Sequence, residues 1–181
     1  MSITNNPGAT LFKDIEVMLN DKTITYAGSN YAERAIMETL LSFGKDATTS
    51  WLQAGVYYKD SPGKMDTAEP NPTDVATTNE GLKKRTEFTA NSQLVHTKAK
   101  LHLDIFNQPK PLINNVRMVL RLTRNANTYV LMASEAGAAY KVDIEQIYLN
   151  VRKVKVADDV MEKVAKQSIP YPLTRVVQKD W

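Results

Sequence analysis

Residues 115–123 read NVRMVLRLT, and residues 140–156 read YKVDIEQIYLNVRKVKV. In the first stretch four apolar residues share one parity: Val116, Met118, Leu120 and Leu122. This alternation predicts a strand with one buried face, so we expect these four residues in the core. Their burial contributes about 6–12 kcal/mol, whereas ordering the nine backbone residues costs roughly 9–18 kcal/mol. The strand therefore requires neighbours and a second layer, and an antiparallel sandwich is the usual solution.

The second stretch changes phase along its length. Val142 and Ile144 share one parity, and the apolar set then moves to the other: Ile147, Leu149 and Val151. A shift of one residue turns every side chain to the opposite face, so we expect a β-bulge near Glu145 and Gln146 that bends the strand between two sheets. Alternatively, both faces are covered over part of the strand. We expect the latter three apolar residues in the core.

Further strands are predicted at residues 11–19 and 94–106, with a last strand beginning at 173–177. In the first of these, the apolar residues Leu11, Ile15, Val17 and Leu19 share one parity. Asn20 and Asp21 then predict a turn before the β-prone KTITY, which favours a hairpin. Residues 51–58 are aromatic and predict either a short strand or a lid over the core.

Helices are predicted at residues 31–43, 80–88 and 158–167. The first has Ser29 or Asn30 as its cap and Gly44 as its stop, and its apolar residues recur at helical spacing: Ala35, Ile36, Leu40 and Phe43. Residues 60–79 contain prolines, Gly63 and small polar residues without periodicity. They predict a long exposed loop, and loops of that length are commonly functional.

The composition is that of a globular chain long enough for one domain with a core. Of its 181 residues, 43% are hydrophobic and 24% charged, with a net charge of +3 from scattered residues of both signs. No cysteine is present, which excludes a thiolate metal site and suits folding inside the cell. No apolar run is long enough to cross a bilayer, so we expect no membrane insertion.

Two groups of residues suggest metal binding, and neither has the required spacing. The two histidines, His96 and His102, lie about 20 Å apart on an extended strand, so a structural or surface role is expected for them. Asp60, Asp66 and Asp74 lack the alternating ligands and closing glutamate of a calcium loop. We expect no metal and no cofactor.

Short basic runs at residues 83–85 and 152–155 are typical of a solvated face, so we expect little contact with nucleic acid. No glycine-rich phosphate loop and no serine-elbow motif occurs in the sequence. The sequence therefore predicts a protein that is not an enzyme.

Several blocks of the chain resemble one protein family. They read LFKDIEVMLNDKTIT (11–25), YAERAIMETLLSFG (31–44), YYKDSPGKMDT (57–67), NEGLKKRTEF (79–88), KLHLDIFNQPKPLINNVRMVLRLTR (100–124), YKVDIEQIYLNVRKVKV (140–156) and YPLTRVV (171–177). In these blocks the chain resembles the hexon-like major capsid proteins of Polinton/Maverick elements and adintoviruses, which also occur as uncharacterised reading frames in invertebrate genomes. The likeness is collinear over nearly the whole chain.

The resemblance implies a structural virion protein. Its members are double jelly-roll subunits that form homotrimers, and these tile an icosahedral shell beside neighbouring capsomers and a vertex (penton) protein. We therefore expect a mainly β fold, in which residues 1–181 form a single, truncated N-terminal jelly roll with two or three short helices in its connections. The expected contact between subunits is the 60–79 loop and its base, with four residues: Tyr58, Asp60, Lys64 and Asp66.

Two other functions remain open at this point. A free-standing carbohydrate-binding β-sandwich would use Trp51, Tyr57 and Tyr58 as a platform for stacking sugars. A nucleic-acid-binding accessory protein would show affinity that falls steeply with salt.

Overall fold

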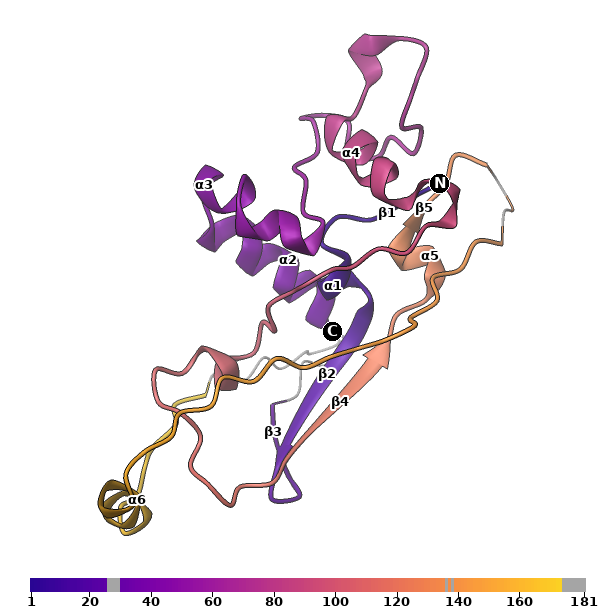
Figure 1. The fold of residues 1–181 in the computed structure, drawn as a ribbon. Helices are drawn as coiled ribbons and strands as arrows, with labels where there is room; N and C mark the ends of the chain where they lie inside the picture. Colours follow the sequence, from indigo (N-terminus) through magenta and orange to yellow (C-terminus); the bar gives the residue numbers. More distant parts are fainter. Residues whose placement is uncertain (26–29, 136, 138, 174–181) are drawn as a thin grey trace, which may run out of the picture.

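The computed structural model describes residues 1–25, 30–135, 137 and 139–173. Its main sheet has three antiparallel strands in the order β3-β2-β4. Their bounds are Phe12–Leu19 for β2, Lys22–Thr25 for β3 and Met118–Arg124 for β4. A smaller sheet pairs β1 (Ser2–Ile3) with β5 (Leu131–Met132). The antiparallel sheet predicted from the sequence is therefore confirmed (Figure 1).

Helices occupy more of the described residues than strands do. The α-helices are α1 (Pro7–Thr10), α2 (Tyr31–Ser42), α3 (Lys45–Thr48), α4 (Glu80–Thr89), α5 (Asn127–Val130) and α6 (Asp158–Ala165), and the 3-10 helices are η1 (Trp51–Gly55), η2 (Val75–Thr77), η3 (Ala90–Ser92) and η4 (Asp104–Asn107). The fold is accordingly mixed rather than mainly β. Predicted helices 31–43, 80–88 and 158–167 correspond to α2, α4 and α6, whereas residues 51–58 form η1 and a following coil rather than a strand.

The β2–β3 hairpin follows from local turn chemistry. Asn20 and Asp21 have φ values of 47° and 64°, the left-handed region that Asn and Asp tolerate better than other side-chain-bearing residues. Asn20 also receives a backbone hydrogen bond from Arg117 to its Oδ1 (3.0 Å) and returns one to the Arg117 carbonyl (2.9 Å). The turn thus fixes where β4 begins beside β2.

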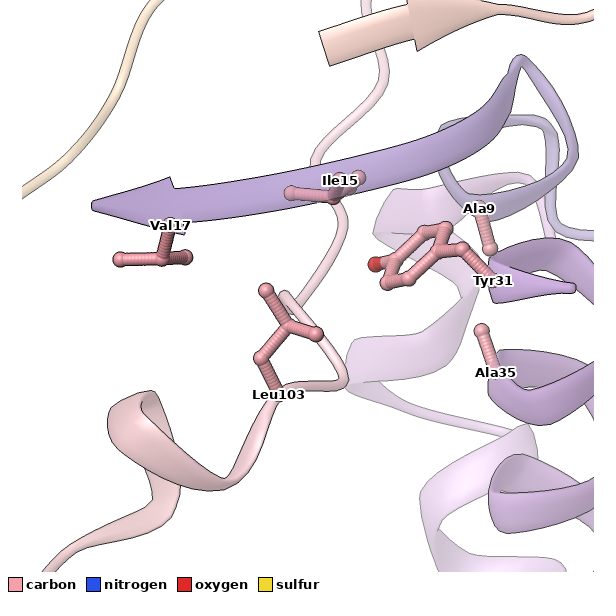
Figure 2. Close-up of a cluster of buried hydrophobic side chains, with 6 residues drawn as sticks. All are labelled: Ala9, Ile15, Val17, Tyr31, Ala35 and Leu103. Carbon is pink, nitrogen blue, oxygen red and sulfur yellow. The ribbon is translucent and has the colours of Figure 1, made fainter. Parts of the chain in front are cut away.

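A layer of helices and loop, instead of a second sheet, covers the main sheet. The buried cluster joins β2 to α1, α2 and the segment before η4, as Figure 2 shows: Ala9, Ile15, Val17, Tyr31, Ala35 and Leu103. Phe12, Leu19 and the β4 residues Met118, Leu120 and Leu122 pack against this cluster. The predicted burial of these three β4 residues is confirmed in part, since each is only half-buried, and so is Val116.

Helix α2 turns a different face to the sheet from the one predicted. Its buried residues are Tyr31, Ala32, Ala35 and Thr39, whereas Leu40 is 58% exposed. Beside Tyr31, the small residues Ala32 and Ala35 let the helix lie close to β2. The residue at the N-cap position is Asn30, and Ser29 lies outside the described residues.

Residues 94–103 form no strand, although their alternation predicts one. His102 and Leu103 are adjacent in the chain and both are buried, because the segment passes between α2 and β2 instead of joining a sheet. Strand alternation therefore does not describe its burial. The predicted strand at 173–177 lies almost entirely outside the described residues.

Residues 141–156 likewise pair with no described strand, and the bulge expected near Glu145 has no ladder to interrupt. They run as a single extended segment toward α6 (Figure 1). The predicted core residues Ile147, Leu149 and Val151 are 57%, 48% and 56% exposed. Their assignment to the core is wrong for this structure, because no sheet or helix of the described chain covers them.

Candidate interaction surface

A buried ion pair holds the base of the 60–79 loop. The Arg85 side chain on α4 is 1% exposed, and its Nη2 lies 2.8 Å from Asp60 Oδ1. Its other donors reach the Tyr58 carbonyl (2.8 Å) and the Ile3 carbonyl (3.1 Å). A buried guanidinium is tolerated when a carboxylate neutralises it and acceptors meet its N–H groups. Arg85 therefore joins helix, loop and N-terminal strand.

The side chain of Asn79 is the second buried group that holds the base of the loop. Its Oδ1 accepts from the backbone N–H of Gly81 (3.2 Å) and Leu82 (3.4 Å), which caps α4, and from that of Ser61 (3.1 Å). Its Nδ2 donates to Asp60 Oδ1 (2.9 Å) and to the Lys64 carbonyl (3.0 Å). The fully buried Asn79 amide therefore caps α4 and also joins the end of the loop to its beginning.

Gly81 allows the first turn of α4 to lie directly against the backbone of Tyr58 and Lys59, just before the loop. A Cβ placed on it would lie 2.6 Å from the Lys59 carbonyl oxygen and 2.7 Å from that of Tyr58. Both distances are well inside van der Waals contact with rigid backbone. Only glycine fits the first turn of α4 while these carbonyls keep their places.

The four residues expected at the contact surface separate into two pairs. Tyr58 and Asp60 belong to the base, where Tyr58 stacks on Phe88 with ring centroids 5.7 Å apart and Asp60 binds Arg85. Lys64 and Asp66 lie further out, with the Lys64 ammonium bound to the Ala76 carbonyl and Asp66 exposed. The loop projects from the body beyond α4 (Figure 1). We call residues 60–79 the projecting loop.

A second polar cluster ties α2 to the segment before η4. Arg34 binds Glu38 (Nε–Oε1 2.8 Å) and Asp104 (Nη2–Oδ1 2.8 Å), and His102 Nδ1 lies 2.9 Å from Glu38 Oε2. The His102 backbone N–H donates to the Tyr31 hydroxyl (3.2 Å), and burial raises the pKa of Tyr31. Apart from the Arg34–Glu38 pair within α2, these contacts join the helix to residues 102–104, so the cluster holds α2 against that segment.

The three aromatic residues expected to stack sugars form no platform. Tyr57 is 6% exposed. Tyr58 is covered by Phe88, and Trp51 meets Phe43 edge to face at 4.9 Å. Sugar stacking requires an open aromatic face, so the platform prediction is wrong for this arrangement.

The basic run at residues 83–85 and the two histidines do not form the sites considered from the sequence. Arg85 is used internally, so the 83–85 run does not present three adjacent charges to a phosphate backbone. His96 is exposed while His102 is buried. Across the described ranges no group of three or more metal-binding side chains is brought together, and no described helix has the length and apolar content to span a membrane.

The outer face of α2 carries an exposed apolar surface. Met37, Leu40 and Leu41 are 57%, 58% and 87% exposed. Contiguous exposed apolar side chains are typical of contact surfaces. Sequence periodicity missed this surface because it placed Leu40 in the core, and it missed Arg85 and Asn79 because charge and amide groups carry no burial signal.

The chain is 24% identical over 176 residues to a Caenorhabditis elegans protein described only as "Uncharacterized protein F54H12.2", covering 93% of this chain and 38% of that protein. The chain thus spans well under half the length of this relative. No family model and no solved structure matches the chain.

Proposed function

We propose that this chain is part of a hexon-like major capsid subunit and that it forms most of an N-terminal jelly roll in a double jelly-roll protein. The proposal rests on the collinear resemblance from residue 11 to residue 177. Its role is structural, without catalysis or cofactor. The complete subunit forms homotrimers that contact neighbouring capsomers and a vertex protein, and it is made in the host cell before it enters the virion.

Within the structure, the observation that best supports the proposal is the buried network at the base of the projecting loop. Arg85, Asp60 and Asn79 form a buried network that joins the two ends of a long surface loop. A contact loop that is ordered beforehand loses less conformational entropy when it binds a neighbour. Such a loop suits a subunit that must meet identical neighbours in a repeated geometry.

The exposed apolar face of α2 supports the same conclusion. Three large side chains in one helix face water: Met37, Leu40 and Leu41. A subunit that buries this face against another copy or another jelly roll would remove the apolar area from water. The proposal therefore predicts two contact regions, the projecting loop and the outer face of α2.

The test is the oligomeric state of the complete subunit encoded by the whole reading frame. Analytical ultracentrifugation and electron microscopy are expected to show trimers. Exchanging two charges on the projecting loop, by Lys64→Glu with Asp66→Lys, should weaken the trimer at least tenfold, a change of about 1.4 kcal/mol. The matched control exchanges two charges on exposed α4 positions, Lys84→Glu with Glu87→Lys.

The outcomes are distinct. Loss of trimer in the loop variant, with an unchanged circular dichroism spectrum and an intact control, supports the proposal. A complete subunit that stays monomeric at all concentrations, or a trimer indifferent to both the loop charges and Leu40→Asp on α2, would contradict it.

A further inference from the structure

The extended segment at residues 141–156 has exposed apolar side chains and no ladder partner. No backbone hydrogen bond joins residues 143–156 to any described strand. Its exposed apolar residues reach from one end to the other: Ile144 (40%), Ile147 (57%), Tyr148 (77%), Leu149 (48%), Val151 (56%), Val154 (62%) and Val156 (38%). A long apolar strand with unpaired N–H and C=O groups is a template for pairing with another chain.

We propose that this segment pairs antiparallel with the same segment of a second copy, about a twofold axis at Leu149. From residue 143 onward the charges of the segment are divided, with Asp143 and Glu145 in its first half and Arg152, Lys153 and Lys155 in its second half. An antiparallel partner reverses that order, so each acidic end meets a basic end. The interaction surface is the segment itself, and the partner is another copy of this chain.

One register satisfies both charge and apolar pairing. With Leu149 opposite Leu149 of the other copy, Asp143 lies opposite Lys155 and Glu145 opposite Lys153. On the same face Ile147 lies opposite Val151, and on the other face Ile144 meets Val154. Gln146 then meets Arg152, and Tyr148 meets Asn150. Directly opposed residues of opposite charge, and directly opposed apolar residues, are the pairs that stabilise antiparallel strands.

The symmetry follows from the register. In a twofold-symmetric contact, each pair between two different residues occurs twice. The Asp143–Lys155 and Glu145–Lys153 pairs therefore give four acid–base pairs, whereas the Leu149 pair occurs once. The Lys141–Asp143 contact (3.0 Å) within one chain is between side chains about 70% exposed. Such a surface pair contributes little, so it does not prevent Asp143 from meeting Lys155.

The free edge of β4 within the same chain is the competing partner. Arg124 binds the Val142 carbonyl and Asn127 Oδ1 accepts from the Val142 N–H (3.2 Å), which places the start of the segment near the end of β4. A hairpin with Val142 opposite Arg124 would place Gln146 opposite Leu120, whose side chain packs on the core. The self-paired register places no polar residue opposite a core residue and adds the acid–base pairs, so it is favoured.

The first experiment uses the absence of cysteine from the chain. In the intact 181-residue protein, Leu149→Cys places two thiols directly across the twofold axis, where opposed Cα atoms lie about 4.5–5.5 Å apart. A disulfide spans Cα separations of roughly 4.4–6.8 Å. Mild oxidation should therefore give a covalent dimer. Ile147→Cys is the matched control, because its two copies lie four residues out of register, about 13 Å apart.

The second experiment reverses the charges at each end. Asp143→Lys with Glu145→Lys leaves only basic residues among the charged positions of the segment, and Lys153→Glu with Lys155→Glu places acids at all four paired positions: 143, 145, 153 and 155. Each variant alone should self-associate at least tenfold more weakly than the unmodified chain. Mixing the two should restore a one-to-one dimer in sedimentation. Lys83→Glu with Lys84→Glu on α4 gives the same charge change as the acidic variant and should leave the dimer unaltered.

The inference does not depend on the capsid proposal and can fail separately from it. A cross-link at position 149 but not at 147, together with pairing only in the mixture, supports the twofold contact. An unmodified chain that stays monomeric at every concentration overturns it, as would equal cross-linking at both positions. A trimer indifferent to these charges would favour the capsid trimer and overturn the strand contact.

Discussion

Strand β4 and the segment at residues 141–156 carry similar alternation of apolar residues, yet only β4 belongs to a sheet. β4 lies beside β2, with Leu122 opposite Ile15 and Leu120 opposite Val17. Ile15 and Val17 are fully buried, so β4 adds side chains to an existing core. The segment at 141–156 has comparable residues and no described neighbour. Alternation indicates the capacity to form a strand, and a partner strand whose side chains match decides whether the strand forms.

The largest expected loss of stability comes from placing a charge in β4, and the same substitution in the segment at residues 141–156 serves as the comparison. Leu120→Asp should lower the free energy of unfolding by on the order of 3 kcal/mol, since its side chain packs against the buried cluster. Leu149→Asp should change it by less than about 0.5 kcal/mol, because Leu149 is 48% exposed. Urea denaturation followed by circular dichroism measures both. Equal effects would show that residues 141–156 are as well packed as β4.

An effect of similar size is expected from the buried ion pair, and it tests whether the stability of the fold depends on strand pairing alone. Arg85→Ala should cost about 3 kcal/mol, because it removes the guanidinium that neutralises the Asp60 carboxylate and donates to the Tyr58 and Ile3 carbonyls. The comparison variant is Arg121→Ala, which removes a cross-strand pair with Glu16 from a guanidinium that is 65% exposed. That change should cost less than about 1 kcal/mol. Similar values in urea denaturation would contradict the structural role given to Arg85.

The smallest effect concerns Tyr129 on α5, between β4 and the extended segment. Burial, and then the hydrogen bond from its hydroxyl to Glu33 Oε1 (2.7 Å), raise the pKa of Tyr129 to about 12. The fold therefore favours the neutral phenol. Its contribution to stability is complete below the unfolded pKa near 10 and is lost as the pH rises through about 12.

Phenolate absorbance measured against pH tests this assignment. Comparison with Tyr129→Phe isolates the contribution of this residue, and Glu33→Gln should lower its pKa toward the ordinary value. Titration of Tyr129 near pH 10 in the unmodified protein would show that α5 is not held against α2.

Local sequence signals predicted those elements whose cause is local. The β2–β3 turn follows from Asn20 and Asp21, and α4 lies where a helix was predicted, at residues 80–88. β2 was found because Ile15 and Val17 share the buried face. Each of these features depends on residues within a few positions of one another, and such residues lie close together in any compact fold.

The features that the sequence did not predict depend on contacts between residues distant in the chain. Arg85 and Asp60 are 25 residues apart, and His102 and Glu38 are 64 apart. Neither pair has a sequence signature, so the buried networks were not predicted. The helical layer was mistaken for a second sheet because the alternation at residues 94–103 and 141–156 suggested strands that have no partner in the structure.

Gly81 limits how far this sequence can vary. In most exposed helices, replacing glycine by alanine stabilises the fold by up to about 1 kcal/mol, so mutation tends to remove glycine there. At position 81 the carbonyls of Tyr58 and Lys59 exclude even a methyl group. A substitution that improves the helix would therefore push the base of the projecting loop away. Helix and loop are bound to change together, and descendants of this chain can alter the outer part of the loop freely only while residue 81 remains glycine.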